Sequence, residues 1–328
     1  MKKASTFLLA FIFISLSVYS QEERTVMVEH FTNTNCGICG TRNPDLLNNL
    51  RDHNPEVIHI AYYPSKPYAD CKLHLHNSDQ NDSRTKYYDI YGSTPRVIIQ
   101  GENAPRANFK DENLYDDYKG QNSDYSIKTL YQRKDDKILT RVTLTSMTST
   151  QWEDLLLQVV LVEDTVYYKG RNSEDHHPNV FRKALTDVNG DDISQEVAEG
   201  DSLVFTYQTA YHKDWDKNRM YAIAWLQDAE TKEILQAKKG SKGPVDNITG
   251  LNTKAIKTIQ PHIQNGTLSI SSEYTGSIYQ IYSVSGQLMT KGNLSTSGIP
   301  INALKSGVYF INVENANGVP TRGKFIVR

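Results

Sequence analysis

Short runs of alternating polar and apolar residues fill the chain from about residue 125 onward and constrain its fold more than any other feature. Five of these runs are expected to be strands: 125–132, 137–146, 155–162, 202–207 and 221–228. A period of two places one set of side chains in a core and the other in solvent, as in antiparallel sheets. The pattern predicts a β-sandwich domain over residues 123–240.

The first part of the chain has a different order of elements. Residues 25–33 and 57–63 are rich in β-branched and aromatic residues and are expected to be strands. Between them, residues 43–52 carry leucines at helical spacing, and residues 96–100 are expected to form a third strand. Strand, helix and strand in this order predict an α/β domain over residues 21–122.

The last part of the chain is again rich in short strands. Glycine and polar residues dominate residues 241–250, which are expected to be a linker. Strands are expected at 277–284, 307–313 and 323–328. Residues 251–328 are therefore predicted to form a second β-sandwich.

The N-terminus has the pattern of a secretory signal peptide over residues 1–20. Lys2 and Lys3 precede an apolar run over residues 7–18, and Ser20 fits the position before a cleavage point. A membrane anchor is the alternative, but the run is short for a hydrocarbon layer of about 30 Å. No later segment is long and apolar enough to be a membrane-spanning helix, so we expect none after the signal is removed.

The charge of the chain indicates which partners to expect, and its cysteines indicate which disulfides can form. The formal net charge of −2 gives no general attraction to nucleic acid, so no nucleic-acid partner is expected. Export to an oxidising compartment favours disulfides, and three cysteines leave one unpaired. Cys71 is predicted to be that residue, as a free buried thiol.

Cys36 and Cys39 form a CxxC pair between an expected strand and an expected helix. A cysteine at the start of a helix has its thiolate stabilised by free backbone N–H groups and by the helix dipole. The thiolate is the nucleophile in disulfide exchange, so Cys36 is expected to attack and Cys39 to resolve the mixed disulfide. These two cysteines are the leading candidates for catalysis.

The residues around this pair resemble the thioredoxin superfamily. Gly37, Pro44 and the Thr94-Pro95 pair before a strand match positions of that superfamily. Asn35 and Ile38 depart from its usual residues, so the direction of electron transfer stays unassigned.

The resemblance implies two further roles. Pro95 would form a cis-proline loop against the dithiol. A buried proton acceptor for Cys39 would be either Glu29 or His30, which alternation places on opposite faces of the strand.

Two other interpretations of the cysteine pair stay open. It could be a purely structural disulfide on a binding scaffold. It could also join Cys71, His74 and His76 in a zinc or copper site, although the second CxxC of a common zinc site is missing. Neither a cofactor nor a resident metal is predicted.

Two wider resemblances cover most of the chain. The segments 28–39, 88–101 and 177–192 together resemble the 28-kDa outer-membrane protein (Omp) family, which implies a cell-surface protein with suspected adhesion or receptor roles. The segments 281–286, 304–313 and 324–328 resemble a type IX secretion C-terminal sorting domain, which implies export by that machinery from a Gram-negative bacterium.

The sequence thus predicts an α/β thioredoxin-like domain followed by two all-β sandwiches. The leading hypothesis is an exported surface or outer-membrane protein with thiol–disulfide oxidoreductase activity, whose partners are protein thiols or disulfides and the type IX machinery. The alternative is a non-enzymatic binding or adhesion protein that contacts a surface ligand and uses the CxxC as a structural disulfide.

Overall fold

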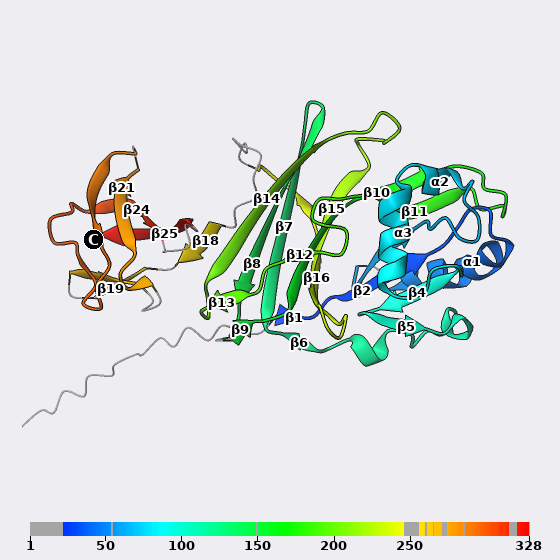
Figure 1. Cartoon of the computed structure of the whole chain (residues 1–328), viewed down its shortest axis with the longest axis horizontal. Helices are drawn as coiled ribbons and strands as arrows, with labels where there is room; N and C mark the ends of the chain where they lie inside the picture. Colours follow the sequence, from blue (N-terminus) through cyan, green and yellow to red (C-terminus); the bar gives the residue numbers. More distant parts are fainter. Residues whose placement is uncertain are drawn as a thin grey trace, which may run out of the picture.

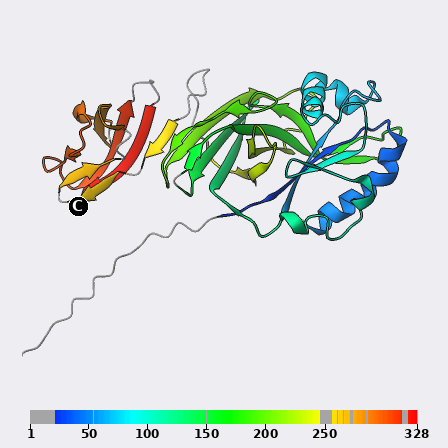
Figure 2. The same cartoon turned by 60° about the horizontal axis from the view of Figure 1, so that its bottom comes forward.

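The computed structural model shows an elongated molecule with its helices at one end and its C-terminal strands at the other (Figures 1 and 2). It describes residues 22–327, apart from 54, 149, 246–255, 260, 265, 271–273, 285 and 315–319. The predicted signal peptide and the second half of the predicted linker, residues 246–250, lie outside the described residues. In the part of the chain that is described, no helix is long and apolar enough to cross a membrane.

One nine-stranded sheet runs through the helical end and the middle of the molecule. Eight of its strands follow the order β16-β15-β10-β11-β3-β2-β4-β5, and β12 pairs with β10 off this path. Their bounds are β2 Val26–Phe31, β3 Val57–Tyr62, β4 Arg96–Ile99, β5 Glu102–Ala104, β10 Leu155–Tyr167, β11 His176–Ala184, β12 Asp191–Asp192, β15 Met220–Asp228 and β16 Ile234–Lys239.

The fold class predicted from the sequence, an α/β thioredoxin-like domain followed by two all-β sandwiches, is wrong. The described chain is mostly strand, and β2 to β5 do not form a sheet of their own. Strand β11 pairs in parallel with β3, with Val180 opposite Ala61, so strands from both sides of the boundary expected after residue 122 share one sheet. Periodicity reports which face of a strand is buried but not which strand lies beside it.

Helices cover both faces of this sheet at the helical end. The helices are α1 Gly37–Asp52, α2 Lys72–Leu75 and α3 Ser78–Tyr87, with short 3₁₀ turns at Arg106–Asn108 and Asp116–Tyr118. Leu46 and Leu50 of α1 pack on Val26 and Val28 of β2. Because the opposite face also packs into a core, all six residues of β2 are buried. Both Glu29 and His30 are therefore interior residues.

A second nine-stranded sheet connects the middle of the molecule with its C-terminal end. Its order is β17-β7-β8-β14-β18-β25-β24-β21-β22, and β18 links the two parts by pairing with β14 and β25. The bounds are β7 Tyr125–Lys134, β8 Lys137–Ser146, β14 Ser202–Ala210, β17 Ser241–Lys242, β18 Ile256–Ile259, β21 Ile278–Ser283, β22 Leu288–Asn293, β24 Gly307–Glu314 and β25 Pro320–Val327.

Three small sheets complete the described structure. They pair β1 with β6, pair β9 with β13, and join β19, β20 and β23. Their bounds are β1 Glu22–Glu23, β6 Asn122–Ser123, β9 Thr150–Trp152, β13 Gln195–Val197, β19 His262–Gln264, β20 Thr267–Ser269 and β23 Ile299–Pro300. The C-terminal strands enclose a separate apolar core that includes Ile281, Tyr309 and Phe325.

Candidate functional site

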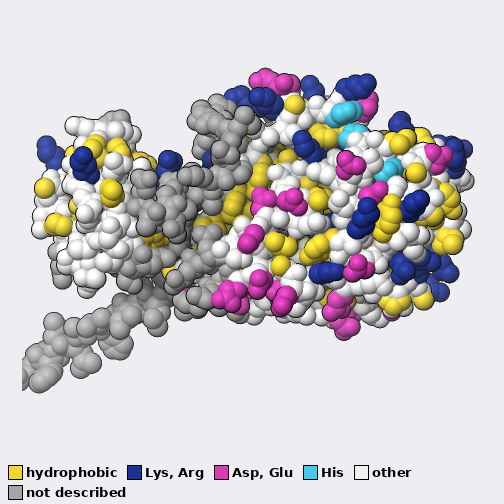
Figure 3. Space-filling model, viewed as in Figure 1, with side chains coloured by type: hydrophobic (Ala, Val, Ile, Leu, Met, Phe, Trp, Pro, Cys, Tyr) yellow, Lys and Arg dark blue, Asp and Glu magenta, His cyan; other side chains and the backbone are white. Residues whose placement is uncertain are grey.

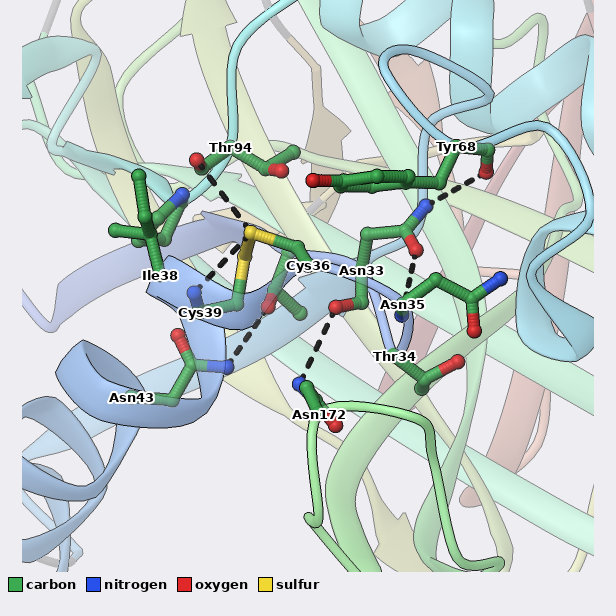
Figure 4. Close-up of a disulfide and its surroundings, with 12 residues drawn as sticks. Asn33, Thr34, Asn35, Cys36, Ile38, Cys39, Asn43, Tyr68, Thr94 and Asn172 are labelled. Atoms are coloured by element: carbon green, nitrogen blue, oxygen red, sulfur yellow. Dashed lines mark hydrogen bonds between the residues drawn. A yellow bond between two sulfur atoms is a disulfide. The ribbon is translucent and has the colours of Figure 1, made fainter.

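Cys36 and Cys39 form a disulfide at the first turn of α1 (Figure 4). Cys36 is the N-cap residue, with extended backbone angles of φ −90° and ψ 110°. Its sulfur accepts a hydrogen bond from the backbone N–H of Cys39 at 3.1 Å. The leucine spacing predicts a helix from residue 43, but the helix begins at Gly37, so the disulfide caps it directly.

A loop before β4 lies against the disulfide from the other side. The carbonyl oxygen of Thr94 is 3.7 Å from the Cys36 sulfur, and the Thr94–Pro95 peptide bond is cis. Arg106 holds this loop, since its Nε donates to the Pro95 carbonyl at 2.8 Å and its Nη2 donates to Ser93 Oγ at 2.6 Å. Pro95 and Cys36 are therefore neighbours in the fold.

The disulfide lies just beneath the surface, next to exposed apolar side chains. Cys36 exposes 3 % of its surface and Cys39 none. Ile38, between them, is 54 % exposed, and the ring of Tyr68 is also exposed. In Figure 4, Thr94, Ile38 and Tyr68 lie around the Cys36 sulfur on the side away from Asn172.

A polar network lies beneath the first turns of α1. Asn43, one turn after Cys39, donates from Nδ2 to Thr32 Oγ1 at 2.8 Å and to Glu174 Oε1 at 2.7 Å. Its Oδ1 is 3.1 Å from His30 Nε2. Because Asn43 donates to the other two groups, His30 donates from Nε2 to Oδ1, and Nδ1 is the basic nitrogen of the neutral ring.

Burial controls the charge of the histidines in this network. Desolvation lowers the pKa of His30 to about 4, although the hydrogen bond that His30 donates to Asn43 opposes the shift. The neighbouring His59, with its ring centroid 5.6 Å away, has a pKa lowered first by burial and then by repulsion from His30. Both rings are therefore neutral at pH 7.

Glu29 is part of a buried ion pair on the opposite face of β2. Arg84 of α3 donates from Nε and Nη2 to the two Glu29 oxygens at 2.7 and 2.9 Å, and the Tyr88 hydroxyl donates to Oε2 at 2.5 Å. The carboxylate and the guanidinium are both almost fully buried. This pairing satisfies Glu29 away from the disulfide, whereas His30 lies on the α1 face.

The loop between β10 and β11 clamps the segment that carries the cysteines. The backbone N–H of Asn172 donates to the Thr34 carbonyl at 3.0 Å, and its side chain donates to the Asn33 carbonyl at 3.3 Å. A Cβ added to Gly40 would lie 2.4 Å from the Asn172 carbonyl oxygen, so glycine permits this close approach. Glu174, at the end of the same loop, reaches Asn43.

The residues proposed for a metal site are engaged elsewhere. The buried Cys71 sulfur lies 3.1 Å from Thr34 Oγ1. His74 Nδ1 lies 3.0 Å from the Tyr63 carbonyl oxygen, and His76 Nε2 accepts from the Trp215 indole. Among the described residues, no group of three or more potential ligands is arranged to hold a metal.

Sequence reasoning missed Asn43, Glu174 and Arg106. Asn43 could have been found, because a residue four positions after Cys39 lies on the same helix face. Glu174 had no such signal, since it is 131 positions from the Asn43 side chain that it contacts.

The model of the family described as outer membrane protein Omp28 matches residues 81–244, half of the chain. The chain belongs to the Omp28 family. A secretion system C-terminal sorting domain matches residues 259–328. This Omp28-family protein is therefore an exported protein of the outer membrane or cell surface of a Gram-negative bacterium and carries its own sorting domain.

One solved structure with a TM-score above 0.5 has a similar fold. HBP35 of Porphyromonas gingivalis has a TM-score of 0.53 and 17% identity, covering 93% of this chain and 99% of that one. A protein from Agrobacterium tumefaciens has a TM-score of 0.43 and 13% identity, covering 70% and 100%. A domain of the outer membrane lipoprotein Omp28 from P. gingivalis has a TM-score of 0.27 and 17% identity, covering 36% and 86%. A search of curated proteins gave no match.

Proposed function

We propose that this Omp28-family protein exchanges thiols and disulfides with other proteins at the cell surface, through Cys36 and Cys39. The observation that carries the proposal is the hydrogen bond from the Cys39 N–H to the Cys36 sulfur at the first turn of α1. After reduction, the same N–H and the helix dipole would stabilise a Cys36 thiolate. Thiolate stabilisation lowers the pKa of a cysteine and makes it a good leaving group.

The exchange balances with a protein dithiol as the co-reactant. One substrate thiolate attacks the Cys36 sulfur, the bond between Cys36 and Cys39 breaks, and Cys39 leaves with the electron pair and takes up a proton. The second substrate thiolate then attacks the substrate sulfur of the mixed disulfide. A disulfide forms within the substrate, and Cys36 is released as a thiolate. Two electrons and two protons pass from the substrate to the protein pair, and the reverse reaction reduces a substrate disulfide.

In the reverse reaction, in which Cys39 attacks and loses its proton, the proposed proton acceptor is His30, because it lies on the α1 face of β2. The ring is neutral because burial lowers its pKa to about 4, and the hydrogen bond to Asn43 leaves Nδ1 unprotonated. Glu29 has no such role here, because Arg84 and Tyr88 occupy both of its oxygens.

A surface-binding protein with a structural disulfide is the second candidate. The small exposure of Cys36 favours it, since an exchanging sulfur must be reached by its substrate. In that case the pair acts only by closing a short loop, which adds little to stability compared with long loops.

Trapping of mixed disulfides distinguishes the two candidates. In a Cys39→Ser variant, a substrate bound to Cys36 cannot be released by the resolving thiol, so covalent complexes with surface proteins should accumulate. A Cys36→Ser variant should give none, and Cys71→Ser, which changes a buried thiol outside the pair, should behave as the native chain. If Cys39→Ser forms no covalent complex while remaining folded, the exchange proposal fails.

A further inference from the structure

The outer face of the C-terminal sheet carries large apolar side chains that nothing in the described structure covers. Along β24 and β25, residues at every second position point inward to the core, including Tyr309 and Phe325. The alternate positions point outward, and there Phe310 is 43 % exposed and Ile326 is 54 % exposed. Exposed apolar groups that lie together mark interaction sites more often than isolated ones do.

Strand pairing gathers these outward residues into one patch. Phe310 lies opposite Tyr282 of β21, and Tyr282 lies opposite Leu288 of β22. Beside this row, Ile326 lies opposite Val308. Directly opposite residues lie on the same face with their Cβ atoms about 5 Å apart, so the five side chains form a continuous surface across four strands.

Basic side chains border the apolar patch. Two of them, Lys324 and Arg322 of β25, lie opposite Phe310 and Asn312 of β24. The third, Lys291 of β22, lies opposite Gln280 of β21. All three are exposed. Figure 3 shows hydrophobic and basic side chains together on the surface of this C-terminal part.

We infer that this face, defined by Phe310, Tyr282, Leu288, Val308 and Ile326 with its basic border, is the surface by which the sorting domain docks onto the secretion machinery. The partner surface is a protein groove with apolar walls and an acidic rim. Apolar anchors supply most of the affinity at such interfaces, while complementary charges at the rim guide the encounter and select the partner.

Surface delivery of full-length variants in a bacterium with type IX secretion tests this inference. Phe310→Ser and Lys324→Glu remove one anchor and reverse one border charge. Each should lower the protease-accessible fraction on the cell surface about tenfold, as expected when an interface anchor is lost, with the protein retained in the periplasm. Phe310→Leu, which keeps an apolar side chain, should restore delivery.

A matched control separates docking from general exposure. Val284 is 70 % exposed at the turn between β21 and β22, and Val284→Ser should be delivered normally. Thermal unfolding of the purified full chains should give the same midpoint for all variants within about 2 °C, as expected of surface substitutions.

Three results would overturn the inference. The first is normal delivery of both Phe310→Ser and Lys324→Glu. The second is a native dimer in light scattering that Phe310→Ser dissociates, which would make a second copy the occupant. The third is Lys324-dependent binding of the native chain to phosphatidylglycerol vesicles with normal delivery of the variant, which would assign the face to lipid.

Discussion

Removal of the Glu29 carboxylate tests whether this residue is structural, as its contacts indicate. A Glu29→Ala variant leaves the Arg84 guanidinium buried without its two carboxylate bonds of 2.7 and 2.9 Å, and it also removes the acceptor of the Tyr88 hydroxyl. The guanidinium then keeps Gln227, whose oxygen accepts from Arg84 at 2.8 Å, as a hydrogen-bond partner, but Gln227 carries no charge to balance it. An uncompensated buried charge costs about 3–5 kcal/mol.

That cost converts into a measurable change in unfolding temperature. For a unit of about 150–250 residues, 1 kcal/mol lowers the midpoint by about 2–4 °C, so we expect a decrease of roughly 6–20 °C in a calorimetric scan. The double variant Glu29→Leu with Arg84→Met removes both charges and should recover most of the loss. Disulfide-exchange activity per folded molecule should not change.

Two outcomes would refute this reasoning. An unchanged midpoint for Glu29→Ala would show that the ion pair does not stabilise the sheet. Loss of exchange activity in a folded Glu29→Ala variant would instead return Glu29 to the role of proton acceptor.

Three further predictions concern α1 and its surroundings. Gly40→Ala should destabilise the chain by about 1–3 kcal/mol in urea unfolding, because its Cβ would meet a loop carbonyl at 2.4 Å, whereas Gly37→Ala, with nothing within 4 Å, should stay within about 0.5 kcal/mol. Asn43→Ala should cost about 1–3 kcal/mol by leaving buried partners unpaired, and an equal loss in the exposed Asn48→Ala would contradict this. The pKa of His30 falls from 6.5 unfolded to about 4 folded, so the unfolded state binds more protons, and His30 alone should contribute about 3 kcal/mol to the loss of stability as the pH falls from about 6.5 to 4. A His30→Gln variant should flatten this part of the curve of unfolding temperature against pH, and an unaltered slope would show that His30 is not the titrating group.

Local patterns were enough to find most strands. The apolar alternation of residues 137–146 and 202–207 predicted β8 and the first part of β14, which the structure confirms. In these segments the period of two reflects one face in the core and one in solvent, and that is a property of each strand alone. The same holds for residues 307–313, which lie within β24.

The pairing of the strands into sheets could not be predicted from local patterns. The contact that joins the two parts of the first sheet is a parallel pair between β3 and β11, more than a hundred positions apart. Parallel pairing leaves no short turn signal in the sequence. The predicted separate α/β domain failed for this reason, although its strands and helix were found.

The candidate site shows the same division between local and distant information. The position of Cys36 at a helix start follows from residues within one turn of it. The burial of Glu29 against Arg84 and the contact of Glu174 with Asn43 depend on segments 55 and 131 positions away. Alternation correctly placed Glu29 and His30 on opposite faces, but it could not tell which face held the disulfide.

The rate of alkylation of the reduced protein against pH tests the central claim most directly, with Cys39→Ser and Cys71→Ser combined so that Cys36 is the one remaining thiol. If the first turn of α1 stabilises its thiolate, the rate should follow a pKa well below the free-thiol value of about 8.5. A pKa at or above that value, or a thiol that reacts only after unfolding, would contradict the proposal and leave the disulfide a structural one.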